Sequence, residues 1–237
     1  TTQRWHVRVS QGTGLLLHLL VIFFTTKQIE AGSFPLSLVL FGATAVLVMV
    51  GLLLELPSGK AFFSLLLLPL AVSIMIMANL RESALLGPDF HGSWFFFHVL
   101  CTVAGECFFF LAALSAVTYL YLVRGLKLKN QLRAMFFFPP LTRLDHLTSA
   151  FAAVGLALFG LGILLGSNWS WQVHGILGLS HPKKLGSIIF FLFFCALFLG
   201  RKWFAWVGKS WAYACLTGFS VSLILMFGVN GYAHWDP

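Results

Sequence analysis

Eight long stretches of this sequence contain no Asp, Glu, Lys or Arg, and they decide which kind of fold the chain can adopt. They cover residues 9–26, 31–54, 61–80, 90–105, 107–123, 146–182, 185–200 and 210–235. Hydrophobic residues make up 59% of the chain and charged residues only 9%, with a mean hydropathy of +0.92. A water-soluble domain of 237 residues does not have this composition, and we interpret the chain as an integral membrane protein.

Only Glu106 separates the fourth stretch from the fifth, so we expect one helix across both. A helix needs about 20 mostly apolar residues to cross the hydrocarbon core of a bilayer. The sequence therefore predicts an all-α fold, a polytopic transmembrane helix bundle of about seven spans, or eight if an N-terminal span precedes residue 1. Internal repeats and low-complexity linkers are missing, which predicts a single transmembrane helical domain over residues 1–237.

The basic residues lie mostly at one side of the predicted spans. The chain has 15 Lys and Arg against 7 Asp and Glu. With the N-terminus inside, eleven basic residues lie on the inner side and four on the outer side, as the positive-inside rule requires. We expect a bacterial inner (cytoplasmic) membrane, with the C-terminus outside. The basic run RGLKLKNQLR, residues 124–133, is expected to contact anionic lipid and no nucleic acid, the alternative being a solvated loop.

Five of the eight histidines are predicted to lie at the outer membrane face. Neutral imidazole is a favoured ligand of haem iron, so this cluster indicates a metal or haem site. For any one of these residues, the alternative is an interfacial histidine whose ring nitrogens form hydrogen bonds with water. His18 alone lies well away from both faces, which argues against two haems stacked across the membrane. The five outer residues are His91, His98, His174, His181 and His234.

Glu106 lies inside the fourth predicted span, eight residues after His98. An ionised carboxylate at mid-bilayer costs roughly 2.5 to 3.5 kcal/mol on insertion scales. We therefore expect Glu106 to face the bundle and to be neutral or hydrogen-bonded. Its functional role would be that of a proton-handling group or of a polar neighbour of a haem propionate. The alternative is a structural hydrogen bond between helices.

Motifs of several other functional classes are missing from the sequence. It contains no phosphate-binding loop, nucleophile elbow or HExxH zinc motif. The four cysteines form neither CxxC nor CxxCH, so we expect them to be small packing residues inside helices.

Three stretches of the sequence carry a family pattern. They are FHGSWFFFHVLCTVAGECFFFLAALSAVTYLYLVRGLKLK, LDHLTSAFAAVGLALFGLGILLGSNWSW and LGSIIFFLFFCALFLGRKWFAWVGKSWAYACLTGFSVSLILMFGVNGYAH. The first has a His-Val pair near its outer end and basic residues after its inner end. The second ends in GSNWSW, and the third ends in a histidine. Together they resemble the CcsA and HemX group of cytochrome c assembly proteins.

The resemblance implies membrane helices that handle haem, with external histidines beside a tryptophan-rich loop where haem is presented to apocytochrome c. By position, His98 and His234 match the two external histidines, and they would be the axial ligands of the iron of a haem b. His181 or His174 would be an auxiliary ligand. The tryptophans of the GSNWSW segment, Trp169 and Trp171, would line the porphyrin face, the alternative for both being an interfacial aromatic belt.

The chain also departs from the family pattern. Where the family runs from Trp-Ser-Trp into Asp-Pro-Lys-Glu, this chain inserts QVHGILGLS and then reads HPKK, so both acidic residues are missing. Gly200 stands where CcsA-type proteins carry a histidine, which leaves His18 without an obvious partner. The HemX-like branch is therefore the closer match.

Two hypotheses for the function follow. In the first, the chain is a haem-binding or haem-delivery membrane component of cytochrome c maturation. It would belong to a haem lyase (cytochrome c synthase) system, would not be catalytic alone, and would have other membrane assembly subunits and apocytochrome c as partners. In the second, it is a non-catalytic accessory or regulatory membrane subunit that keeps the scaffold without haem. The altered loop favours the second hypothesis, and the retained pair His98 and His234 favours the first.

Overall fold

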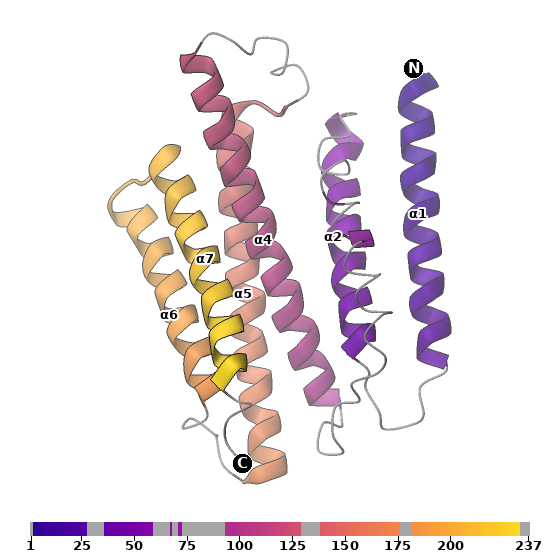
Figure 1. Cartoon of the computed structure of the whole chain (residues 1–237), viewed down its shortest axis with the longest axis vertical. Coiled ribbons are helices and arrows are strands. Elements are labelled where there is room, and N and C mark those ends of the chain that lie inside the picture. The colour runs from indigo at the N-terminus through magenta and orange to yellow at the C-terminus, as the bar shows by residue number, and fades with distance from the viewer. Residues whose placement is uncertain are drawn as a thin grey trace. The chain divides into compact units, whose positions relative to one another are not determined.

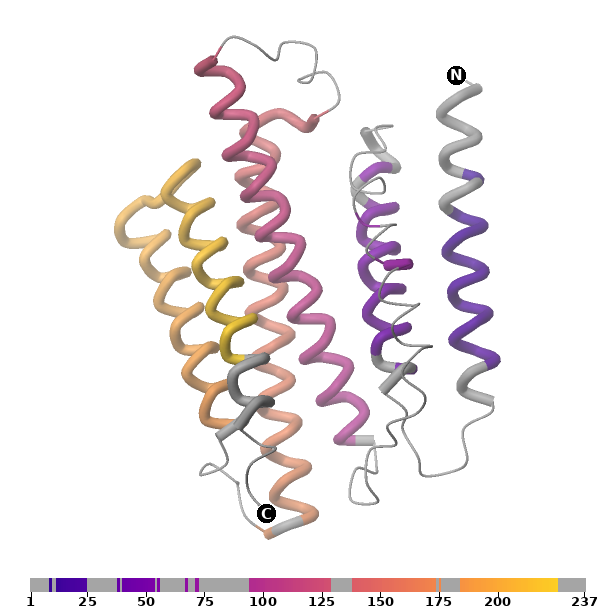
Figure 2. Tube along the Cα trace, in the orientation of Figure 1, coloured from indigo at the N-terminus to yellow at the C-terminus, as the bar shows by residue number. Residues whose placement is uncertain are grey.

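The computed structural model describes the backbone over residues 2–27, 36–58, 67, 71–72, 93–128, 138–175 and 182–232. Within this part the regular structure is entirely helical, which confirms the all-α prediction (Figure 1). Side chains are described for most of these residues, coloured in Figure 2. The helices are α1 (Thr2–Lys27), α2 (Leu36–Ser58), α4 (Ser93–Lys127), α5 (Leu141–His174), α6 (Pro182–Trp203) and α7 (Lys209–Tyr232).

Three helical segments in the described residues are long and apolar enough to cross a membrane, namely Trp94–Lys127, Leu141–Val173 and Lys184–Trp203. Two shorter apolar helical segments, Gly12–Phe24 and Leu40–Leu53, accompany them. At about 1.5 Å per residue, the 35 residues of α4 are longer than the roughly 30 Å of a hydrocarbon core, so α4 is long enough to cross it. The total of seven spans stays a prediction.

The chain divides into two compact units, Thr1–Phe96 and Phe97–Pro237. In the first unit α1 packs against α2, and His18 of α1 is 7% exposed. Its Nε2 lies 3.0 Å from the carbonyl oxygen of Phe41 and 2.7 Å from the hydroxyl oxygen of Thr44. A carbonyl oxygen only accepts, so Nε2 carries the proton and donates to α2. His18 therefore has polar partners inside its own unit. The single domain over residues 1–237 stays a prediction.

In the second unit, successive helices α4, α5, α6 and α7 run in opposite directions (Figure 1). The C-terminal ends of α4 and α6 and the N-terminal ends of α5 and α7 therefore lie at one end of the unit. We call this the basic end, and we call the opposite end, where α4 begins and α5 ends, the His98 end. The described basic side chains of the basic end are those of Arg124, Lys127, Arg143, Arg201, Lys202 and Lys209.

An aromatic cluster from α4, α5 and α6 forms the centre of this unit. The Phe109 ring lies 4.2 Å from the Phe194 ring, 5.4 Å from Phe190 and 6.0 Å from Phe159, measured between centroids. All four side chains are at most 5% exposed. Gly218 of α7 leaves room for the Phe194 ring, which brings α7 onto the same core. The cysteines are free, as expected of packing residues: Cys101, Cys107, Cys195 and Cys215.

Two glycines allow the backbones of α4 and α5 to approach closely. A Cβ placed on Gly105 would lie 3.0 Å from the Phe159 nitrogen and 3.1 Å from the Gly155 oxygen. A Cβ on Gly155 would lie 3.1 Å from the Gly105 oxygen. Small residues at such crossings are typical of membrane helix pairs, because lipid supplies no hydrophobic driving force and packing must hold the helices together.

The tryptophan-rich segment is helical. The resemblance suggests that GSNWSW opens an external loop, yet α5 continues through Trp169 and Trp171 to His174. No glycine or proline lies between Gly166 and Gly175, and Gly175 adopts a left-handed φ of 67° and donates its N–H to the Trp171 carbonyl at 3.0 Å. Glycine takes this conformation without steric cost, so the helix ends there.

Candidate functional site

His98 lies near the start of α4 and makes a hydrogen bond to the backbone of α5. Its Nδ1 is 2.7 Å from the carbonyl oxygen of Gly162. Because a carbonyl oxygen only accepts, Nδ1 carries the proton and donates. A neutral imidazole with this tautomer has its lone pair on Nε2, which is the form that binds a metal ion.

Glycines on α5 make room for the His98 ring. A Cβ on Gly166 would lie 2.6 Å from Nδ1 and 2.7 Å from Cε1 of that ring. A Cβ on Gly162 would lie 2.5 Å from Oγ1 of Thr102, whose hydroxyl donates to the His98 carbonyl at 2.7 Å. We call His98, Thr102, Gly162 and Gly166 the His98 site. The sequence pattern identified the histidine but not the two glycines, which stand four residues apart on one face of α5.

The two tryptophans predicted to line a porphyrin lie on different sides of α5. Trp169 follows Gly166 by three residues, so it continues the face that contacts His98, and its indole nitrogen is buried. Trp171 lies about 200° further around the helix at 3.6 residues per turn, and it is 57% exposed. Trp169 is therefore the tryptophan on the His98 side of the helix.

The other predicted ligands fall outside the described side chains. His174 is the last residue of α5, at the His98 end, but only its backbone is described. His181 and His234 lie outside the described residues altogether. Across the side chains that the structure does describe, no group of three or more His, Cys, Asp or Glu could hold a metal ion. The ligand assignments of these three histidines stay predictions.

Glu106 faces the inside of the four-helix unit. The hydroxyl of Ser222, on α7, donates to Oε2 of Glu106 at 3.1 Å. Nearby on the same two helices, the rings of Phe110 and Phe219 lie 5.8 Å apart between centroids. The expectation that Glu106 faces the bundle and is hydrogen-bonded is confirmed. Its partner could not be predicted, because Ser222 lies 116 residues further along the chain.

Replacing Glu106 by glutamine should leave expression and stability nearly unchanged. The amide oxygen of glutamine can still accept the Ser222 hydrogen bond. Glu106→Ala removes the acceptor and should cost about 1 to 3 kcal/mol, the penalty of a buried hydroxyl without a partner. Apparent melting temperatures of the purified variants in detergent measure this difference. If haem occupancy and cytochrome c maturation are both unchanged in Glu106→Gln, the functional role is ruled out and the structural hydrogen bond is left.

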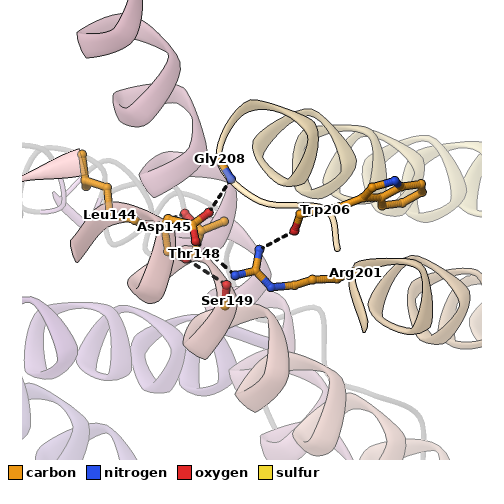
Figure 3. Close-up of polar contacts among 7 residues, drawn as sticks. All are labelled: Leu144, Asp145, Thr148, Ser149, Arg201, Trp206 and Gly208. Carbon is orange, nitrogen blue, oxygen red and sulfur yellow. Dashed lines mark hydrogen bonds and ion pairs between the residues drawn. The ribbon is translucent and has the colours of Figure 1, made fainter. Parts of the chain in front are cut away.

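A polar network that the sequence did not indicate joins three helices at the basic end (Figure 3). Nη2 of Arg201 lies 3.1 Å from Oδ2 of Asp145, and the Gly208 N–H donates to Oδ1 at 3.0 Å. Nη1 of Arg201 donates to the Trp206 carbonyl at 3.0 Å, and its guanidinium lies 4.7 Å from the centre of the Trp211 ring. We call these five residues the Asp145 network. The Asp145 carboxylate accepts one hydrogen bond on each oxygen, from Arg201 of α6 and from the Gly208 N–H, and so holds the α6–α7 turn against α5.

Gly200 is part of the same end of the unit. A Cβ on Gly200 would lie 3.0 Å from Cζ3 of Trp206, so the indole ring packs directly on this glycine. The position where the resemblance expects a histidine is thus covered by a tryptophan of the following turn.

Comparison with models of protein families matches residues 9–234 to the family described as "Cytochrome C assembly protein". The match covers nearly the whole chain and includes both the His98 site and the Asp145 network. Comparison with individual curated proteins finds no match.

Proposed function

Because the chain belongs to the cytochrome c assembly protein family, we propose that it is a haem-binding or haem-delivery membrane component of cytochrome c maturation, presenting haem at the outer face. Family membership implies the role in maturation. One observation supports the further step to haem: His98 donates Nδ1–H to Gly162, and in this tautomer Nε2 carries the lone pair that would bind the iron. Histidines that bind metals almost always donate their other ring N–H in this way.

In this proposal His98 and His234 are the axial ligands of a haem b, and His181 or His174 is an auxiliary ligand. When bound, the haem supplies an iron with two axial positions for imidazole nitrogen. The Gly162 carbonyl holds the His98 ring in one tautomer and one orientation. Trp169 lies on the same side of α5 as His98 and would cover one porphyrin face. Exposed Trp171 would reach the porphyrin from the outer surface of the helix or join the interfacial belt.

The proposed orientation places the basic end inside and the His98 end outside. Six described basic side chains lie at the basic end, against Lys184 at the other, and cytoplasmic ends of membrane helices carry this excess. A site at the outer face suits a component that hands haem to apocytochrome c together with other membrane subunits of a haem lyase system. The N-terminus then lies inside and the C-terminus outside, in a bacterial inner membrane.

The haem proposal predicts a loss of haem in one histidine variant and none in another. Purified wild-type protein supplied with haem should show a low-spin Soret band, as expected of two imidazole ligands. His98→Ala should lower haem occupancy at least tenfold, and added imidazole should partly restore it. His146→Ala, an exposed histidine at the basic end, is the matched control and should bind haem like the wild type. A wild-type protein without Soret absorbance after haem is supplied would contradict the proposal.

A second candidate function is an accessory or regulatory subunit without haem. The specific observation in its favour is the GSNWSW segment, which is helical to His174, together with the missing acidic residues of the family loop. The same absorption spectrum separates the two functions, because the accessory subunit would stay colourless and would still be required for maturation.

A further inference from the structure

The packing of α5 against α4 and α6 brings one lysine to the level of the His98 site. On one side, the His98 ring lies against Gly166, where an added Cβ would be 2.6 Å from Nδ1. On the other side, the Phe191 ring of α6 lies against Gly160, where an added Cβ would be 2.7 Å from Cε2. Because α5 and α6 are antiparallel, Lys184, seven residues before Phe191, is level with the residue seven positions after Gly160. That residue is the next one after Gly166, and seven residues are about two turns, so Lys184 lies on the face of α6 that contacts α5.

Contacts between α4 and α6 give the same level independently. The Phe109 ring of α4 lies 4.2 Å from the Phe194 ring and 5.4 Å from the Phe190 ring of α6, measured between centroids. The two helices run in the same direction. His98 precedes Phe109 by eleven residues, and Lys184 precedes Phe194 by ten and Phe190 by six. Averaged over the two contacts, His98 and Lys184 are therefore within about one turn of each other along the bundle. The charge of the half-buried Lys184 acts on the His98 ring, as expected at this separation.

The side chains change character between the aromatic cluster and this level. In the cluster, phenylalanine rings fill the space between α4, α5 and α6. Two turns closer to the His98 end, the same helix faces carry small residues in place of Phe109, Phe159 and Phe194, namely Thr102, Gly166 and Ser187. On α6, Lys184 takes the place of Phe191. An imidazole that can bind iron and an ammonium group, accompanied by small side chains, match a metal complex that carries carboxylates.

We infer that Lys184 binds a propionate of the haem whose iron His98 binds, an inference that rests on the proposed function. The ammonium group would donate a charge-assisted hydrogen bond to the propionate carboxylate. With the iron held at Nε2 of His98, this second contact would fix the rotation of the porphyrin about the iron–Nε2 bond. It would also give the HPKK segment, where both acidic residues of the family pattern are missing, a function of its own in this chain.

The inference is tested by Soret titration of the purified protein in neutral detergent with two ligands, haem b and its dimethyl ester, in which both carboxylates are neutral. Wild-type protein should bind the ester about tenfold more weakly than haem b, the effect expected of one lost hydrogen bond between charged groups. Lys184→Gln should bind haem b about tenfold more weakly and should bind the ester as the wild type does. Lys184→Arg keeps the cation and should restore most of the affinity for haem b. The Soret band should stay low-spin in both variants, because the iron ligands are unchanged.

Lys202→Gln is the matched control, because it removes the same charge from an exposed side chain at the basic end. It should bind both ligands like the wild type. If the wild type binds both ligands equally well, or if esterification weakens binding to Lys184→Gln as much as to the wild type, Lys184 does not contact a propionate. Either result would overturn the inference and leave the proposed haem function standing. Wild-type protein without a Soret band for either ligand would contradict the proposed function, and the inference with it.

Discussion

Arg201→Ala should lower the free energy of unfolding of the four-helix unit by about 2 to 3 kcal/mol. The substitution removes a charge-assisted hydrogen bond to Asp145, each such bond contributing about 1.5 to 3 kcal/mol. It also removes the bond to the Trp206 carbonyl and the contact with the Trp211 ring, which adds about 0.5 to 1 kcal/mol. The side chains of the ion pair are 19% and 18% exposed, so the loss stays below the cost of breaking a fully buried pair.

The measurement is equilibrium unfolding of the purified protein in mixed detergent micelles. Lys202→Ala is the matched control, because it removes the same charge from the exposed neighbouring position and should change stability by at most about 0.5 kcal/mol. A double-mutant cycle with Asp145→Ala isolates the coupling between the two partners. If Arg201→Ala unfolds like Lys202→Ala, the Asp145 network does not stabilise the fold.

Gly166→Ala should lower haem occupancy about 10- to 100-fold while leaving the protein folded. The added Cβ would lie 2.6 Å from Nδ1 of His98, so the ring must move and its hydrogen bond to Gly162 is lost. Losing the partner that orients a ligating histidine typically costs 10- to 100-fold in metal affinity. The readouts are the Soret band per mole of protein and its low-spin character, together with the apparent melting temperature.

Gly160→Ala is the control for the steric effect of an added Cβ on α5. It lies on the same helix, and its added Cβ would meet Cε2 of Phe191 at 2.7 Å, a similar clash on a face away from His98. Both variants should lose about 1 to 3 kcal/mol of stability from overpacking. Only Gly166→Ala should lose haem. Equal haem occupancy in the two variants would mean that the position of the His98 ring does not matter for binding.

The membrane class and the functional family could be predicted from the amino-acid sequence alone. Long apolar stretches without charge are hardly compatible with any class but a membrane protein. The His-Val pair, GSNWSW and the last apolar stretch carried the family resemblance. The orientation of individual side chains could be predicted less well. Trp169 and Trp171 were both predicted to line the porphyrin face, which stays a prediction, and the helix places them on different sides of α5. The Asp145 network had no sequence signal, since Asp145 and Arg201 are 56 residues apart.

The sequence by itself determined that this protein lies in a lipid bilayer and that its chain is helical. Stretches without charge are stable in lipid, where every backbone polar group must be satisfied within the chain, and a helix does this locally. Only the tertiary structure decided the tautomer of His98, the partner of Glu106 and the pairing of Asp145 with Arg201. Those partners lie between 56 and 116 residues apart. Spacing along one helix predicts which residues share a face, but the register and rotation of one helix against another depend on where glycines such as Gly105, Gly155 and Gly166 let the helices touch.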